Sequence, residues 1–196
     1  MTALLPGLHA ALLLARGRAD ALALLPPLGD RSALDPMASA RQSFWAAPLC
    51  VPAFICLHLL EWMQTGAGMP SARGLAADLI GFVAGWAAFA LLSHQLAGRL
   101  GRAEQWPRFI TLWNWCNLVQ YMMFMTAALP GLLGLPDIIG QTAWLAALGW
   151  ALWLEWFMTS LALGLPGMVA AGLVAMDVAL GLIIAGFTGS FGAIGG

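Results

Sequence analysis

Long apolar stretches, interrupted by turns rich in proline and glycine, dominate this sequence of 196 residues. A transmembrane α-helix needs roughly 20 mostly apolar residues, and helix-breaking turns mark where one span ends and the next begins. We therefore predict an all-α fold, a polytopic membrane helix bundle with about five transmembrane helices. The expected spans are residues 44–63, 75–97, 107–129, 138–163 and 167–191.

The low charge of the chain agrees with lipid as its main solvent. Only 9% of the residues are charged and 61% are hydrophobic, and the net charge is -1. A soluble domain carries roughly 25% charged residues, so this composition cannot cover a water-exposed surface of this size. We expect the lipid bilayer as the main partner, and the lack of a basic patch predicts no binding of nucleic acid.

The first 41 residues form a separate region in this interpretation, made of a cytoplasmic amphipathic helix and a polar connector. Leucines recur at every fourth position from Leu4 to Leu12, which is the spacing of one helical face. The helix can lie in the membrane interface or pack on the protein's own helices, and the sequence fits both. Residues 30–41 are the expected connector, and residues 42–196 the five-helix transmembrane domain.

The arginines predict how the chain is oriented. Seven of the eight precede the first span or lie around the turn between the second and third spans, and only Arg73 falls on the other side. Basic residues concentrate on the cytoplasmic side of membrane proteins, so we expect the N-terminus in the cytoplasm and the C-terminus outside. Arginine is used to the exclusion of lysine, which indicates a GC-rich bacterial genome and hence the bacterial inner membrane.

Three polar residues are expected near the outer surface. His58 and Glu61 lie three positions apart near the end of the first span, on one helical face, and Asp78 lies near the start of the second. Together they could bind a cation from outside. The alternative is that Glu61 sits in water at the end of its helix, without a site.

A second polar group lies deeper in the spans. At about 1.5 Å per residue, Asn117, Glu155 and Asp177 fall at a similar depth. An acid in lipid is costly, so these residues should face the interior of the bundle. They fit either a proton or cation relay or a hydrogen-bonded core that fixes the register of the helices. The full set is Glu155, Asp177, Asn114, Asn117, Gln120 and His94.

Small residues predict where helices approach closely. Gly81 and Gly85 form a G-x-x-x-G pair in the second span, a spacing that lets two helix backbones meet. We favour packing within the chain, while a homo-oligomer or another membrane protein stays open as a partner.

No enzyme motif is recognisable. The sequence contains no phosphate-binding loop, no pair of histidines placed for haem, and no serine beside an evident base. The histidines, cysteines and acids lack the spacing of a metal site. We therefore expect no catalytic residues, no metal and no cofactor.

Three features of the layout are shared with a known family. They are Asp35-Pro36 ahead of the first span, the aromatic-rich fourth span around residues 151–154, and the tight turn at residues 164–167. With a cytoplasmic N-terminal segment and five spans, the chain resembles the Yip1-type membrane proteins over roughly residues 15–190. The resemblance implies a non-enzymatic membrane factor and assigns no functional residue, since that family has no catalytic motif.

Two functions follow as expectations. The favoured one is a non-enzymatic membrane scaffold or accessory protein of the Yip1 type. The alternative is a small proton- or cation-linked transporter or channel that uses Glu155 and Asp177. The two differ in whether these acids face a hydrated cavity or a dry, hydrogen-bonded core.

Overall fold

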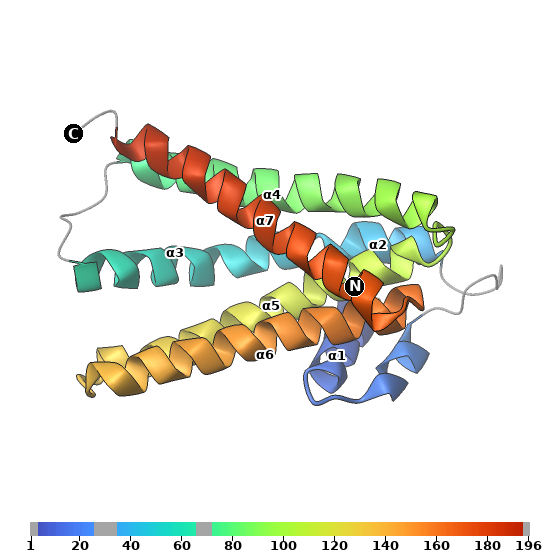
Figure 1. Ribbon diagram of the computed structural model, residues 1–196, viewed down its shortest axis with the longest axis horizontal. Helices are drawn as coiled ribbons and strands as arrows, with labels where there is room; N and C mark the ends of the chain where they lie inside the picture. Colours follow the sequence, from blue (N-terminus) through green and yellow to red (C-terminus); the bar gives the residue numbers. More distant parts are fainter. Residues whose placement is uncertain (1–3, 26–34, 66–71, 194–196) are drawn as a thin grey trace.

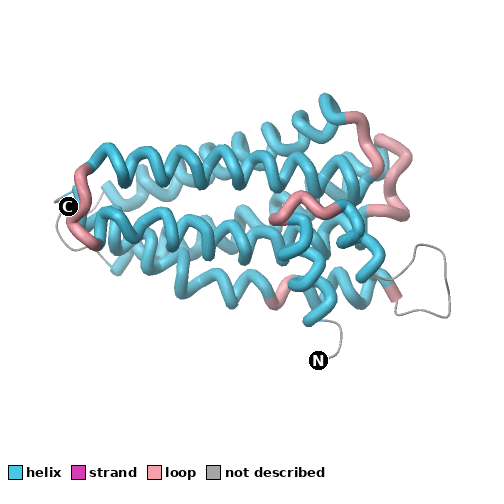
Figure 2. The backbone as a smooth tube through the Cα atoms, turned by 90° about the horizontal axis from the view of Figure 1, so that it is seen from below, coloured by secondary structure: helices cyan, strands magenta, loops and turns pink. Residues whose placement is uncertain are grey.

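The computed structural model describes residues 4–25, 35–65 and 72–193. All regular elements in these ranges are helices, which confirms the all-α class, and they form one elongated bundle (Figures 1 and 2). The elements are α1 (Leu4–Leu14), η1 (Ala19–Leu24), α2 (Pro36–Ser43), α3 (Ala46–Thr65), α4 (Ala72–Arg99), α5 (Trp106–Leu132), α6 (Asp137–Leu163) and α7 (Gly167–Ala193).

The five long helices α3 to α7 run back and forth along the bundle (Figure 1). They cover the five stretches expected from the sequence, and their ends differ from the expected ones by at most three residues, as at Ala72 and Leu132. Such agreement is possible because apolar length, prolines and glycines act locally.

Four segments of the described chain are long and apolar enough to cross a membrane. They are Pro36–Glu61, Ala72–Arg99, Asp137–Leu163 and Gly167–Gly189. The first of them joins α2 to most of α3. Four spans, rather than five, are therefore supported by length and composition together.

Helix α5 is long enough to cross a membrane, but it contains none of these four apolar segments. Its first half is buried, including the polar Thr111 and Asn114, because α1, α2, α3 and α6 pack around it. A helix that its neighbours shield from lipid can carry more polar side chains than a helix that faces lipid. The central position of α5 thus explains its lower hydropathy.

The N-terminal region differs from the single amphipathic helix expected. It contains two short helices, α1 and η1, separated by a turn in which Gly17 has a φ of +75°. Helix α1 packs on α5, with Ala10 and Leu14 fully buried and Gly7 against the indole of Trp115. Of the two placements that the sequence fitted, the structure shows packing on the protein's own helices.

The expected connector at residues 30–41 is partly wrong, because α2 begins at Pro36. The Asp35 side chain accepts a hydrogen bond from the backbone N–H of Met37 at 3.0 Å, and proline occupies the first helical position. Both are helix-start signals, and they outweigh the polar character of the segment. Residues 30–34 lie outside the described residues.

Helices α6 and α7 form an antiparallel hairpin, joined by the tight turn at residues 164–167. Gly164 ends α6 with a φ of +60°, and the Leu165 N–H donates to the carbonyl of Ser160 at 3.1 Å. Arg102, in the turn before α5, donates to the Gly164 carbonyl at 3.1 Å. The hairpin is thereby tied to the neighbouring turn.

Gly81 and Gly85 pack α4 against α7. A Cβ atom on Gly81 would lie 2.7 Å from the Cγ2 atom of Thr188, closer than a real contact allows. At Gly85 the corresponding distance to the Cδ1 atom of Ile184 is 3.6 Å. The prediction that this pair serves packing within the chain is confirmed.

Candidate functional site: a cavity between α3, α4, α5 and α7

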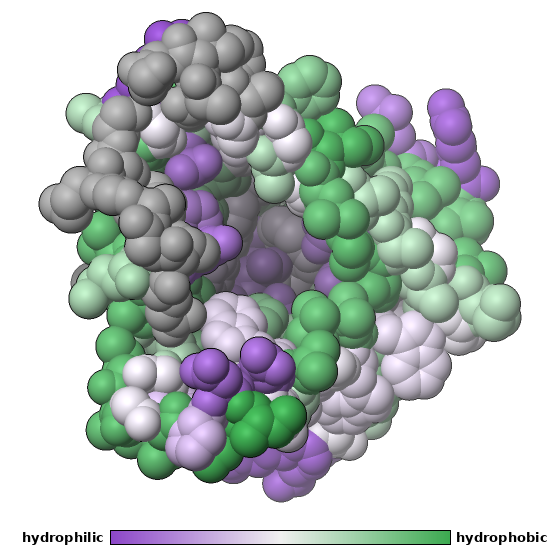
Figure 3. Space-filling view, turned by 60° about the vertical axis from the view of Figure 1, so that its left-hand side comes forward, coloured by the Kyte–Doolittle hydropathy of each residue, from purple (hydrophilic) through white to green (hydrophobic). Residues whose placement is uncertain are grey.

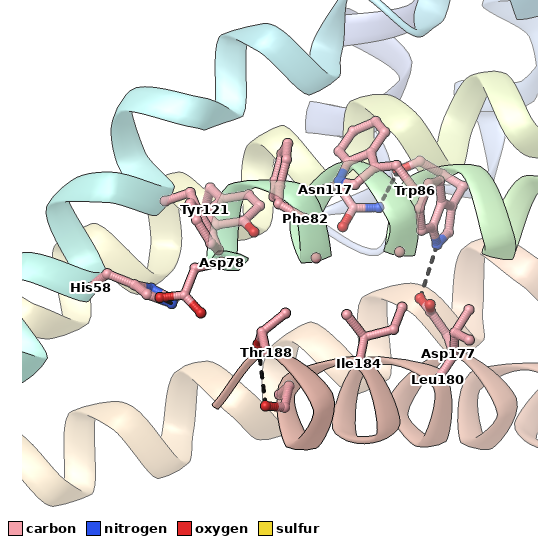
Figure 4. A pocket seen from close by; sticks show the side chains of 16 residues that line it. His58, Asp78, Phe82, Trp86, Asn117, Tyr121, Asp177, Leu180, Ile184 and Thr188 are labelled. Carbon is pink, nitrogen blue, oxygen red and sulfur yellow. Dashed lines mark hydrogen bonds and ion pairs between the residues drawn. The ribbon is translucent and has the colours of Figure 1, made fainter. Parts of the chain in front are cut away.

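Helices α3, α4, α5 and α7 enclose a cavity of about 280 Å³. Figure 3 shows the molecule hollowed on the side where α3 and α7 end, with hydrophilic side chains within the hollow. Figure 4 shows His58 and Asp78 at one end of the cavity and Asp177 at the other. Its other lining residues include Phe54, Phe82, Trp86, Trp113, Asn117, Tyr121, Gly181, Ile184 and Thr188.

His58 and Asp78 mark one end of the cavity. The Nε2 atom of His58 on α3 lies 3.9 Å from the Oδ2 atom of Asp78 on α4. The imidazole also lies against the ring of Phe54, one helical turn earlier, with 4.3 Å between the ring centroids. Both polar side chains are partly exposed at this end of the cavity.

Glu61 does not join this pair at the cavity. Its side chain is exposed and lines a neighbouring pocket between α3, α5 and α6, which His58 and Tyr121 also line. Of the three residues expected in an outer cluster, the structure brings two together at the cavity. Glu61 lies in the neighbouring pocket, which shares the side chains of Phe54, His58 and Tyr121 with the cavity.

Asp177 and Glu155 meet at the deep end. The indole N–H of Trp113 donates to the Oδ2 atom of Asp177 at 3.2 Å. The carboxyl groups of Asp177 and Glu155 are close enough to interact with each other. Asp177 lines the cavity, whereas Glu155 is buried behind it at 8% exposure.

The amides of α5 mostly bind elsewhere. Asn114 donates to the hydroxyl of Ser43 at 2.7 Å, and Gln120 donates to the carbonyl of Ala151 at 3.1 Å. Asn117 donates to the carbonyl of Trp113 within its own helix and lines the cavity with Asp177. Residues three apart on a helix are about 60° apart in direction, so the three amides point at different neighbours.

His94 stands apart from the acids. It is exposed near the end of α4, where its ring meets the edge of Trp106 at a centroid distance of 4.6 Å. Sixteen residues separate it from Asp78 on the same helix, a distance of roughly 24 Å along the axis. The structure therefore places His94 outside the deep group.

Aromatic side chains of the cavity wall are the residues that sequence reasoning missed. Phe82 and Trp86 on α4 are almost fully buried, and Trp86 meets Trp113 edge to face at 5.1 Å between centroids. Their spacing of four residues, which places both on one face of α4, was the sequence signal that could have identified them. The tryptophans at 153 and 156, which are more conspicuous in the sequence, are 37% exposed and lie outside the cavity.

The cavity wall carries more acid than base. Asp78 and Asp177 are in the wall and Glu155 lies directly behind Asp177. Among the described residues that line the cavity, His58 is the one with a basic side chain. In a membrane, where burying a charge is costly, such a surface favours a positively charged or proton-donating guest.

A metal centre finds no support in the described part of the chain. No three histidine, cysteine or acidic side chains come together there in a way that could hold a metal ion. The acids of the cavity lie at its two ends (Figure 4).

Comparisons with protein families, with curated proteins and with solved structures give no match for this chain. A functional conclusion therefore rests on the cavity, on the two carboxyl groups at its deep end, and on the pair of His58 and Asp78 at its other end.

Proposed function

We propose that this chain is a five-span protein of the bacterial inner membrane that exchanges a cation for a proton. Asp177 and Glu155 carry the exchange. The observation that supports this most is the pair of neighbouring carboxyl groups, one of which faces the cavity, and in this proposal the pair holds one shared proton. When a cation binds to Asp177, its positive charge replaces the shared proton in neutralising the carboxylate, and the proton is released.

In this proposal α5 is the fifth span. It has 27 residues, roughly 40 Å as a helix, which exceeds the roughly 30 Å of a hydrocarbon core. It lies between α3 and α6 and packs on both. Its polar side chains Thr111 and Asn114 are covered by protein, so lipid does not have to solvate them.

The arginines favour a cytoplasmic N-terminal side. Six of the described arginines lie at the end of the bundle that holds α1, η1 and α2. One described arginine, Arg73, lies at the other end (Figure 1). Basic residues are retained on the cytoplasmic side. The six are Arg16, Arg18, Arg41, Arg99, Arg102 and Arg108.

A one-sided access route follows from the packing around Trp113. The Trp113 ring stacks on Phe89 at 4.3 Å between centroids, and Phe89 also contacts Phe109. All three rings are at most 4% exposed. Phe89 and Phe109 lie nearer the arginine-rich end than the cavity does, so they close that side and leave the end at His58 and Asp78 as the entrance.

Proton flux in proteoliposomes tests the proposal. Vesicles that contain the full chain and an internal pH dye are given an outward-directed proton gradient, and cations are then added outside. We expect cation-dependent proton release that Asp177→Asn and Glu155→Gln abolish. The matched control is Asp137→Asn at the exposed start of α6, which should keep the flux. Equal flux in the two site variants and the unaltered protein would contradict the exchange.

A Yip1-type scaffold is the second candidate. The layer of α1, η1 and α2 on α5 and α6 favours it, because this layer offers a folded, arginine-rich surface at one end of the bundle. A scaffold uses the Glu155–Asp177 pair only to hold helices together. In that case Glu155→Gln leaves function intact, and no cation drives proton flux in the vesicles.

A further inference from the structure

We infer that the cavity binds a small organic ammonium ion, with its charge at Asp177 and its alkyl groups against aromatic rings. This inference rests on the proposed function, because it names the class of cation exchanged for the proton. Three observations lead to it: the oxygen atoms of the wall, the rings of the wall, and the space beside a glycine of α7.

The oxygen atoms of the wall do not form a site for magnesium or calcium. Magnesium and calcium need about six to eight converging oxygen ligands. Here the two carboxyl groups of the wall, those of Asp78 and Asp177, lie at opposite ends and cannot both reach one ion. The spread of these groups suits a guest that needs one carboxylate and otherwise makes apolar contacts.

Aromatic rings supply the rest of a cation-binding surface. A ring face attracts an ammonium group through its quadrupole, and cages of such rings are used to bind methylated ammonium ions. Tyr121, Phe82 and Trp86 follow one wall of the cavity, facing Thr188 and Ile184 on α7 (Figure 4). The rings of the wall are those of Phe54, Phe82, Trp86, Trp113 and Tyr121.

The charge of the guest is assigned to Asp177 by elimination within the wall. Asp78 is already opposite His58 at 3.9 Å. Asp177 accepts from the neutral N–H of Trp113 and, in the proposed function, holds the exchangeable proton with Glu155; among the described residues it has no cationic partner. An ammonium ion is the group that would replace that proton with a full positive charge.

The volume and a glycine limit the size of the guest. At about 280 Å³ the cavity falls just below the roughly 300–1,000 Å³ of typical small-molecule sites. Gly181 lines it, and a Cβ atom there would meet nothing within 4 Å. A larger side chain at this position would therefore occupy the cavity while leaving the helix packing intact.

Calorimetric titration of the purified full chain in detergent tests the inference. The probe is choline, and its control is 3,3-dimethylbutan-1-ol, which has the same shape without the charge. We expect choline to bind roughly a hundredfold more tightly than the neutral analogue, because only choline pairs with the buried carboxylate. Trp86→Leu should weaken choline binding roughly tenfold.

Two leucine substitutions on α7 separate occupied space from general damage. Gly181→Leu should abolish choline binding, whereas Gly186→Leu should keep it, because Gly186 also has open space around it but lies outside the wall. Circular dichroism and thermal melting check that both variants fold. Equal binding of choline and its neutral analogue, or unchanged choline binding in Gly181→Leu, overturns the inference.

The inference and the proposed function can fail separately. If sodium or potassium drives a proton exchange that depends on Glu155, but the protein does not bind choline, the ammonium site is overturned and the proposed exchange remains. If choline binds and Gly181→Leu abolishes that binding, but no proton flux is found in the vesicles, the ammonium site is supported and the proposed exchange is contradicted.

Discussion

The imidazole of His58 on α3 lies 3.9 Å from the carboxylate of Asp78 on α4, and with the rings of Phe54 and Phe82 it links two helices whose main packing partners differ. Helix α3 packs chiefly on α5, and α4 chiefly on α7. The pair thus stands at one end of the cavity, the end that we propose as its entrance.

The first prediction concerns this pair. Asp78→Asn and His58→Gln should each slow cation-driven proton flux, while the pair contributes less than about 1 kcal/mol to the free energy of unfolding because both side chains are partly exposed. The effects of the two changes on flux should not add in the double variant, since both remove one contact. Glu61→Gln, outside the cavity wall, is the control. Additive effects would show that the two residues act independently.

The second prediction concerns the contact of α4 with α7. Gly81→Ala should lower the free energy of unfolding by about 1–3 kcal/mol, because the new methyl group would lie 2.7 Å from the Cγ2 atom of Thr188. Adding Thr188→Ala removes that atom and should restore most of the loss. Denaturation by SDS, followed by tryptophan fluorescence, measures both. Gly186→Ala, in open space on α7, serves as the reference.

The third prediction concerns the attachment of α1. A methyl group at Gly7 would lie 2.6 Å from the indole of Trp115, so Gly7→Ala should loosen α1 from α5. Hydrogen exchange read by mass spectrometry should become faster in residues 8–14 and stay unchanged in α6. Leu5→Ala, at a position 74% exposed, should have no such effect. Unchanged exchange in Gly7→Ala would mean that the indole moves aside at little cost.

The fourth prediction concerns orientation in the membrane. A reporter inserted in the turn at residues 100–105, between α4 and α5, should read cytoplasmic, and one fused after Gly196 should read external. The basis is the arginine bias between the two ends of the bundle. Glycosylation or phosphatase fusions measure each position separately. The reverse pattern would place the cavity entrance on the cytoplasmic side.

The sequence by itself determined where the long helices lie and that the chain is mostly apolar. Their ends follow from signals that act within a few residues, such as the Gly164 turn and the prolines at 107 and 166. Burial of Glu155 also follows from the sequence, because lipid offers a carboxyl group no hydrogen-bond partner.

Only the tertiary structure decided which side chains meet. The sequence placed Asp177 beside the α5 amides by depth, but its direct partners are Glu155 and Trp113, and Asn114 turns to Ser43 instead. Depth is set by counting along one helix, whereas contact depends on how each helix is rotated about its axis. That rotation is fixed by close packing between helices, as where Gly81 of α4 meets α7 and where Gly7 of α1 meets Trp115. The spacing of apolar residues does not say which neighbouring helix a face will meet.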